Sequence, residues 1–338
     1  MEITIYDVAE KAGVSITTVS RAINNNYPVK EETRKKIEEA IEELGYVPNE
    51  IARSLILKST SSVGIVVPGI TNLFFPTIVE EINRVLVSSG FTMSLYITEG
   101  DTEREKVVVD SIISRNMDGI IAIDPSMENL ENNYFPNLSE KIPIIIINGN
   151  TNKYKCNFIS YDEEVGTKEA FKHLLQLGHR EIAFVRGDRS LSYDLKEDLY
   201  RQFVKDNNLN YEKIISVGMG NSLEVVKKTE AICREFINSK DRGTAIFACN
   251  DLMAVGVINA CNKAKVKVPE DMSVIGFDNT LLSSVNHPKI TTVDLNMQEI
   301  GKNSASVLID MIKGKHTKTK KVVYNTKLIV KESCGKRK

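Results

Sequence analysis

Residues 4–21 read TIYDVAEKAGVSITTVSR, and this stretch decides the fold of the N-terminal part of the chain. Thr4 can cap a helix whose inward face includes Val8, and Asp7 can return a hydrogen bond to the capping residue, as in a capping box. Gly13 ends that helix, because helix C-termini use a left-handed backbone that glycine adopts at little cost. The stretch therefore predicts a short helix between Thr4 and Gly13.

A second short helix is predicted after a turn at positions 13–15. Ser15 can cap a helix over residues 16–24. Val19 and Ile23 then share the inward face of that helix, one turn apart. Two short helices joined by a glycine-containing turn of this length are typical of a helix-turn-helix.

A third helix is predicted after Pro28-Val29, and Gly45 is placed to end it. Its inward positions recur with helical spacing and are Ile37, Ala40, Ile41 and Leu44. Its outward positions carry acidic side chains, Glu38, Glu39, Glu42 and Glu43. A plain three-helix bundle with a solvated acidic face would show the same pattern, so that alternative stays open at this point.

Charge does not mark the chain as a nucleic-acid-binding protein. The formal net charge is −1, and residues 1–60 hold eight Lys and Arg against ten Asp and Glu. If this segment binds DNA, its basic side chains must be sorted onto one face, because phosphate contacts supply most of the non-specific affinity.

Specific motifs in the same residues argue against the plain three-helix bundle. They are TIYDVAEKAGVS at 4–15, TVSR at 18–21, TR at 33–34 and LGYVPN at 44–49. Together, and without a gap, they resemble the lac repressor (LacI/GalR) family of bacterial transcriptional regulators. The resemblance implies a helix-turn-helix DNA-binding domain over residues 1–47.

In that family the second helix lies in the major groove, and the resemblance carries base-reading positions over to Ile16, Thr17 and Arg21. Arg21 suits this role, since a guanidinium can bond guanine O6 and N7 together. Thr17 can bond a base or touch a thymine methyl, whereas Ile16 can offer only apolar contact. The other predicted DNA-binding residues here are short and polar, which suits phosphate contact, and are Thr4, Ser15, Thr18, Ser20 and Asn24.

Residues 48–58 predict a helix of about two turns, capped by Asn49 and too short to be stable alone in water. A plain linker is the alternative. The resemblance implies a hinge helix that forms beside its dimer mate in the DNA minor groove. Leu55 would then be the wedge at a central base step, and Ala52 would allow close approach.

From residue 61 onward, short apolar runs alternate with helix-like segments. The runs predict strands at 63–67, 91–97, 119–123, 143–147, 158–160, 182–185, 214–217, 245–248 and 274–277. Helices are predicted between them, for example at 102–116, 163–177 and 251–264. This alternation is typical of doubly wound parallel sheets, and the number of strands requires two of them.

Looser motifs in this half follow the order of the same family: VGIVVP at 63–68, DGII at 118–121, LGHREIAF at 177–184, NDLMAVG at 250–256 and IGFDN at 275–279. The expected fold is therefore an N-terminal all-α helix-turn-helix domain plus an α/β core of two doubly wound parallel-sheet subdomains, similar to periplasmic binding proteins. The core would span 61–338. Its N-subdomain would hold about 61–160 and 293–322, and its C-subdomain about 161–290 and 323–338.

Ligands of open α/β sheets bind beyond the carboxyl ends of the strands, and this rule selects Asn148, Asn250 and Asp278. The resemblance selects the same positions for an effector. Phe74 and Phe75 could stack on the apolar face of a ring, although either one of them could equally be a core residue.

One family position is not matched. The family commonly places an arginine four residues before the aromatic residue that aligns with Phe203, and this chain has Leu199 there. Arg189, in a loop that carries an insertion, is the candidate replacement. An aromatic used by some members after Gly218 is also missing, so no particular effector can be transferred.

Catalysis and transport are the competing functions. The sequence holds no P-loop, G-x-S-x-G or H-E-x-x-H motif, so we expect no enzyme, no cofactor and no metal. The N-terminus does not read as a signal peptide, and no apolar run approaches the ~20 residues of a membrane helix, which disfavours a transport-type binding protein and a membrane partner. Five scattered cysteines without a C-x-x-C pair indicate reduced thiols in a cytosol.

We therefore expect a cytoplasmic regulator that binds a near-palindromic operator as a homodimer. The resemblance favours repression, although promoter position decides between repression and activation. A small polar ligand such as a sugar or sugar derivative would control operator affinity through hinge-helix pairing, and the sequence leaves open whether it releases DNA or tightens binding.

Overall fold

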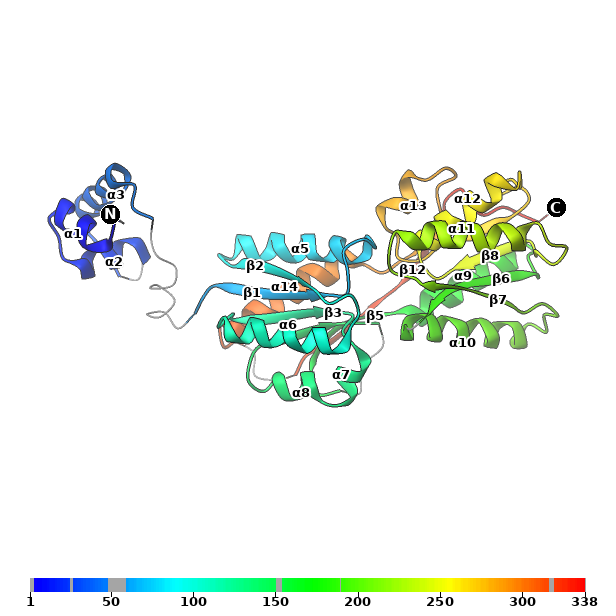
Figure 1. The fold of residues 1–338 in the computed structure, drawn as a ribbon, viewed down its shortest axis with the longest axis horizontal. Coiled ribbons are helices and arrows are strands. Elements are labelled where there is room, and N and C mark those ends of the chain that lie inside the picture. The colour runs from blue at the N-terminus through cyan, green and yellow to red at the C-terminus, as the bar shows by residue number, and fades with distance from the viewer. Residues whose placement is uncertain are drawn as a thin grey trace. The chain divides into compact units, whose positions relative to one another are not determined.

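The computed structural model describes residues 3–24, 27–47, 59–149, 154–188, 190–315 and 319–337. The chain divides into two compact units, Met1–Thr60 and Ser61–Lys338 (Figure 1). The predicted hinge at 48–58, with Asn49, Ala52 and Leu55, lies outside the described residues, and so does Arg189.

The first unit is helical, with α1 (Ile5–Ala12), α2 (Ile16–Asn24) and α3 (Glu31–Leu44). The Asp7 carboxylate accepts hydrogen bonds from both the backbone N–H and the hydroxyl of Thr4, each at 2.7 Å. Gly13 ends α1 in the left-handed conformation with φ of 67°, and the Ser15 hydroxyl accepts from the Thr18 N–H at 3.2 Å. The core of this unit is Val8, Ala9, Val19, Ala22, Ile37 and Ala40. The predicted helix-turn-helix is confirmed.

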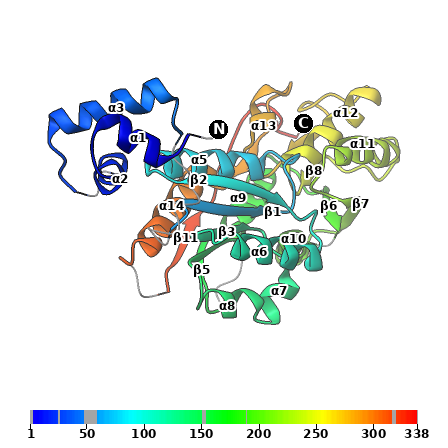
Figure 2. The same cartoon turned by 60° about the vertical axis from the view of Figure 1, so that its left-hand side comes forward.

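The second unit contains a six-stranded sheet in the order β11-β5-β4-β3-β1-β2, in which every pairing is parallel. The strands are β1 (Ser62–Val67), β2 (Thr92–Ile97), β3 (Gly119–Ile123), β4 (Ile144–Ile147), β5 (Asn157–Asp162) and β11 (Lys321–Asn325). One face is covered by α5 (Phe74–Ser88) and α14 (Met297–Ile312), and the other by α6 (Thr102–Ser114), α7 (Met127–Glu131) and α8 (Tyr134–Leu138) (Figure 1, Figure 2).

A four-stranded parallel sheet follows in the order β7-β6-β8-β9. Its strands are β6 (Ile182–Asp188), β7 (Lys213–Met219), β8 (Ala245–Ala248) and β9 (Ser273–Ile275). Its helices are α9 (Glu163–Gln176), α10 (Leu191–Asp206), α11 (Glu224–Ile237), α12 (Asp251–Lys263) and α13 (Leu281–Val285). The two parallel sheets confirm the predicted fold class.

The chain passes between the two sheets from β5 into α9 and again from β10 (Thr292–Asp294) into α14. It returns from β11 into β12 (Lys327–Ile329), which pairs with β10 in antiparallel register. The strand predicted at 274–277 ends early, at Ile275, because the following backbone bonds elsewhere. The N–H groups of Gly276 and Asp278 donate to the carbonyls of Thr291 and Val293.

No helix in the described part of the chain is long and apolar enough to cross a bilayer.

Candidate DNA-reading helix and effector cleft

Helix α2 presents the three predicted base-reading side chains to solvent. Thr17 and Arg21 are exposed, and Ile16 is 38% exposed although it is apolar. The Arg21 guanidinium lies 4.9 Å from the centre of the exposed Tyr27 ring. Two other basic side chains of this unit are engaged, since Lys11 pairs with Glu43 and Lys36 with Glu32 on α3. Within residues 3–24 and 27–47, Arg21 forms no ion pair and its charge is available to a ligand.

The predicted phosphate-binding residues lie at the start of α1 and from the start to the end of α2. The hydroxyls of Ser15 and Thr18 lie 2.8 Å apart and are hydrogen bonded to each other. Ser20 is half-buried on the same helix, and Asn24 is its last residue. Thr4 is occupied as the cap of α1, so its polar groups already bond Asp7.

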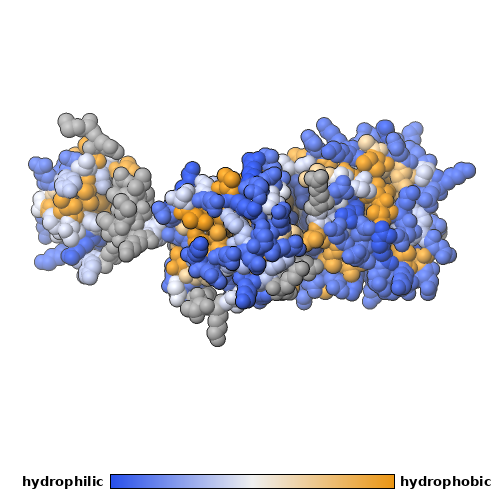
Figure 3. Space-filling model, turned by 60° about the horizontal axis from the view of Figure 1, so that its bottom comes forward, coloured by the Kyte–Doolittle hydropathy of each residue, from blue (hydrophilic) through white to orange (hydrophobic). Residues whose placement is uncertain are grey.

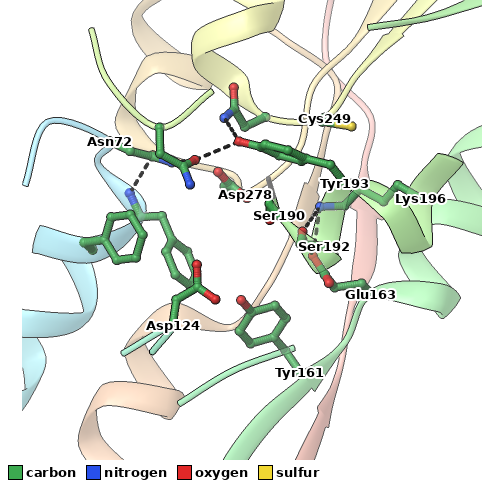
Figure 4. A pocket seen from close by; sticks show the side chains of 14 residues that line it. Asn72, Asp124, Tyr161, Glu163, Ser190, Ser192, Tyr193, Lys196, Cys249 and Asp278 are labelled. Carbon is green, nitrogen blue, oxygen red and sulfur yellow. Dashed lines mark hydrogen bonds and ion pairs between the residues drawn. The ribbon is translucent and has the colours of Figure 1, made fainter. Parts of the chain in front are cut away.

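A cleft lies in the second unit, where the carboxyl ends of both parallel sheets meet. It encloses about 390 Å³ between atoms, part of it open to solvent. The lining side chains are Asn72, Phe74, Phe75, Asp124, Tyr161, Glu163, Ser190, Ser192, Tyr193, Lys196, Asn221, Cys249, Asn250 and Asp278 (Figure 4).

Four sequence-predicted effector residues, Phe74, Phe75, Asn250 and Asp278, line this cleft. Asn148 does not belong to the lining, although it directly follows β4 and is only 9% exposed. Asp124, which follows the neighbouring strand β3, faces the cavity from that sheet instead. Of the three residues that the strand-end rule selected, Asn250 and Asp278 line the cleft and Asn148 does not.

Phenylalanines at the start of α5 form the apolar wall. The rings of Phe74 and Phe75 meet edge to face at 5.2 Å, and Phe74 lies 5.7 Å from the ring of Tyr161. Asn72 fixes this turn, because its side-chain oxygen accepts from the Phe74 N–H at 3.1 Å. Both phenylalanines are at least 95% buried, so they serve the core as well as the cleft.

An amide and phenol network forms the opposite wall. Asn250 caps α12 by accepting from the Met253 N–H at 2.9 Å, and its amide donates to the Tyr193 oxygen at 3.2 Å. The Tyr193 hydroxyl in turn donates to Asn221 at 2.8 Å. Asn221 also accepts from Asn72 at 3.3 Å, which joins the two sides of the cleft directly.

Sequence reasoning missed a charged pair at the floor of the cleft. The Lys196 ammonium lies 2.8 Å from Glu163 and 2.7 Å from the Ser192 hydroxyl. Burial by itself lowers the pKa of Lys196, but the Glu163 carboxylate outweighs it and holds that pKa above its usual value. The ammonium therefore stays charged in a buried site.

The position of Lys196 on α10 explains why the sequence did not predict it. Leu199 and Phe203 lie on another face of α10, where they line a separate groove beside Phe171. Lys196 instead lies four residues before Tyr200, which is fully buried against Phe184. If Tyr200, and not Phe203, corresponds to the family's aromatic residue, then Lys196 occupies the position four residues earlier where the family commonly has an arginine.

Carboxylates dominate the electrostatics of the cleft. Burial raises the pKa of Asp124 to about 7, with Glu163 and Glu105 adding to the shift. Burial also raises the pKa of Asp278 well above its usual value, although Lys196 opposes it. Both residues have a positive φ, 50° for Asp124 and 102° for Asp278, a conformation that strained functional positions often show.

Comparison with known proteins finds relatives of both parts of the chain. Residues 4–49 match the family described as bacterial regulatory proteins, lacI family, and residues 171–334 match a periplasmic binding protein-like domain. The HTH-type transcriptional regulator DegA of Bacillus subtilis (strain 168) is 34% identical over 99% of both chains. The HTH-type transcriptional repressor PurR of Aliivibrio salmonicida (strain LFI1238) is 30% identical over 98% of this chain and 99% of its own.

A solved structure shares both units. The lac repressor dimer bound to operator and the anti-inducer ONPF superposes with a TM-score of 0.86 at 25% identity, covering 98% of this chain and 99% of that one. The helix-turn-helix, the paired parallel sheets and these relatives agree, and the chain belongs to the LacI family of bacterial transcriptional regulators.

Proposed function

We propose that this chain represses transcription by binding a near-palindromic operator as a homodimer, with a small polar ligand in the cleft controlling the affinity. One observation carries the proposal: a single chain joins an exposed helix suited to base reading with a polar, partly open cleft in its core. The solved relative bound to operator and anti-inducer has the same two parts.

Base reading is assigned to Ile16, Thr17 and Arg21. The exposed Arg21 can bond a guanine edge with two N–H groups, and Ile16 can contact a thymine methyl. A half-site read by one short helix carries little sequence information, so two copies related by twofold symmetry suit a near-palindrome.

Pairing with a second copy is supported by apolar side chains at one edge of the six-stranded sheet. They lie on edge strand β2 and the adjacent helices α5 and α6, and are Leu95, Val87, Val107 and Ile113, between 37% and 68% exposed. Figure 3 shows hydrophobic patches interrupting a mostly hydrophilic surface on one face of the molecule. A second copy of the chain would cover such side chains.

Ligand control is assigned to a change in the relative position of the N-subdomain (about 61–160 and 293–322) and the C-subdomain (about 161–290 and 323–338). The Asn72–Asn221 contact joins the two sides now, and a ligand between them would favour one arrangement by its differential affinity. In the proposal, the hinge at 48–58 transmits the change in subdomain position to DNA, with Leu55 and Ala52 in the minor groove.

Catalysis is disfavoured by the charge of Lys196, which forms with Ser192 an arrangement resembling a catalytic dyad. The Ser192 hydroxyl lies 2.7 Å from Lys196, but a lysine acts as a base only when neutral. The Glu163 carboxylate keeps that ammonium charged. We therefore assign Ser192 and Lys196 to ligand binding and cleft structure.

The test is operator selection from random DNA with the purified full chain, followed by filter binding to the selected site. The expected site is near-palindromic, and a matching small molecule from a thermal-shift screen should change its affinity at least fivefold. Recovery of no preferred site, or of a single asymmetric half-site bound by a monomer, would contradict the proposal.

A further inference from the structure

The effector cleft contains more negative than positive side chains. Asp124, Glu163 and Asp278 line it, and Lys196 is the one cation among its described lining residues. That ammonium already lies 2.8 Å from Glu163, with both side chains almost fully buried. Asp124 and Asp278 are thus left without an ammonium of their own in the part of the cleft that the structure describes.

Asp124 and Tyr161 place polar groups without hydrogen-bond partners among the described residues in the same part of the cavity. Neither the Asp124 carboxylate nor the Tyr161 hydroxyl has a hydrogen-bond partner within the described residues, although Tyr161 is only 6% exposed. Figure 4 shows both groups directed into the cavity, from the ends of β3 and β5. The Phe74 ring stands beside Tyr161 at 5.7 Å. A carboxylate among aromatic rings is a combination that binds ammonium groups.

We propose that the effector is a hydroxylated molecule carrying one positively charged amino group, which Asp124 and Tyr161 receive. This inference rests on the proposed function, because it names the class of ligand that the cleft takes. The ammonium supplies the positively charged partner that Asp124 lacks, and it donates a hydrogen bond to the Tyr161 oxygen. The Asn221 amide nitrogen and the Asp278 carboxylate remain for hydroxyl groups. A phosphate or carboxylate on the ligand would instead add to the negative charge of a partly buried site.

Affinity for such a ligand depends on pH. Asp124 is faced by Glu105 of α6, Glu163 of α9, Lys196 of α10, Tyr161 of β5 and Asp278 beyond β9. Burial and the neighbouring carboxylates raise the pKa of Asp124 to about 7, so the unliganded side chain is partly protonated at neutral pH. Because binding needs the ionised carboxylate and the protonated amino group together, affinity should rise severalfold from pH 6 toward pH 7 and fall again above pH 8, where the amino group of the ligand loses its proton.

Calorimetric titration of the full chain at pH 7 tests the inference with matched sugars. The glucose, galactose and mannose series each offer the neutral sugar, the 2-amino sugar, its N-acetyl form and the 6-phosphate of the amino sugar. The expected result is one series in which the amino sugar binds at least tenfold more tightly than the other three. Asp124→Asn should reduce this preference at least tenfold.

Glu128→Gln is the matched control, since it removes one negative charge from an exposed position outside the cleft. Tyr161→Phe keeps the ring and should lower the preference by a smaller factor, and it carries the test should Asp124→Asn fail to fold. Tighter binding of a neutral or phosphorylated sugar, no binding of any amino sugar, or an unchanged preference in both variants overturns the inference.

The two proposals fail separately. If a neutral sugar binds and shifts operator affinity, the amino-group inference falls and ligand-controlled DNA binding stands. If the amino sugar binds with the expected preference but leaves operator affinity unchanged, the ligand class stands and the proposed control of DNA binding falls.

Discussion

Lys196 and Glu163 form an ion pair of 2.8 Å in which only 2% and 3% of the two side chains are exposed. The pair joins α10 to the first residue of α9 at the floor of the cleft. The Lys196 ammonium also lies 3.8 Å from the centre of the Phe277 ring. A dry ion pair of this kind matters most when one partner is removed, because the other is then left buried and uncompensated.

Lys196→Met should therefore lower the free energy of unfolding of the core by about 3–5 kcal/mol, because Glu163 is left in a buried site without its ion-pair partner. Urea unfolding followed by far-UV circular dichroism measures this, since the chain has no tryptophan. The double variant Lys196→Met/Glu163→Gln should recover part of the loss. A loss below 1 kcal/mol in the single variant would mean that water reaches the pair.

Arg21→Ala should reduce the preference for operator over scrambled DNA by roughly 5- to 150-fold, corresponding to the about 1–3 kcal/mol of a bidentate guanine contact. The core should remain folded, since Arg21 is exposed. Filter binding at fixed salt measures both affinities. Lys36→Ala is the control, because that exposed ammonium is paired with Glu32 at 2.8 Å and should not read bases. A wild-type preference in Arg21→Ala would remove Arg21 from the base-reading set.

Ligand should act on DNA through the hinge and not through the helix-turn-helix itself. A variant whose two copies are joined by a disulfide within residues 48–58 should keep its operator affinity when ligand is added, whereas the reduced variant responds like the wild type. Comparing filter binding with and without reductant provides the matched control. If the oxidised variant responds to ligand as the wild type does, hinge separation is not the switch.

Asp124→Asn should stabilise the unliganded core at pH 8 by about 1–2 kcal/mol, after discounting for water in the cleft. The folded pKa of Asp124, about 7, lies above the usual 3.8, so the wild type loses stability as pH rises through this interval. The gain from asparagine should shrink toward zero near pH 4. Urea midpoints at several pH values test this sign, and an equal gain at pH 4 and pH 8 would contradict it.

Stability of the core should also fall in mild acid because of His179. Its ring nitrogens contact Thr244 at 3.0 Å and Ser273 at 2.9 Å, and burial lowers the pKa of the imidazole. The unfolded ring takes up a proton at higher pH than the folded one, so stability is lost as pH drops below about 6.5. His179→Gln should cost about 1–3 kcal/mol and reduce the acid slope. His287→Gln, at an exposed position, should leave the slope unchanged.

Much of the fold follows from local pattern. The bounds of α1 and α2 could be predicted because Thr4, Gly13 and Ser15 each have a specific capping role. The parallel strands could be predicted because both faces of each sheet are buried, which leaves continuous apolar runs such as Ile144–Ile147. Strand β11 has the burial pattern of an exposed edge and no such run, so the sequence gives little sign of it.

The cleft was predictable only in part, since its chemistry depends on tertiary placement. Asn250 and Asp278 follow strand ends in clear motifs. Lys196 lies in the middle of a charged helix, where its neighbours Glu197 and Asp198 suggest a solvated face. Glu163 looks like an ordinary acidic residue in the first turn of α9. Only the packing of α10 against α9 shows that these two charges are buried together.

The left-handed backbone at Asp124 and Asp278 limits how the ligand preference of this protein can evolve. At such φ values asparagine and glycine are tolerated, whereas β-branched and bulky residues are strongly disfavoured. Replacement of either aspartate by asparagine therefore alters the charge of the cleft while preserving its shape. A lineage can move between cationic and neutral effectors by one such exchange, and larger changes of effector size must arise at other positions of the wall.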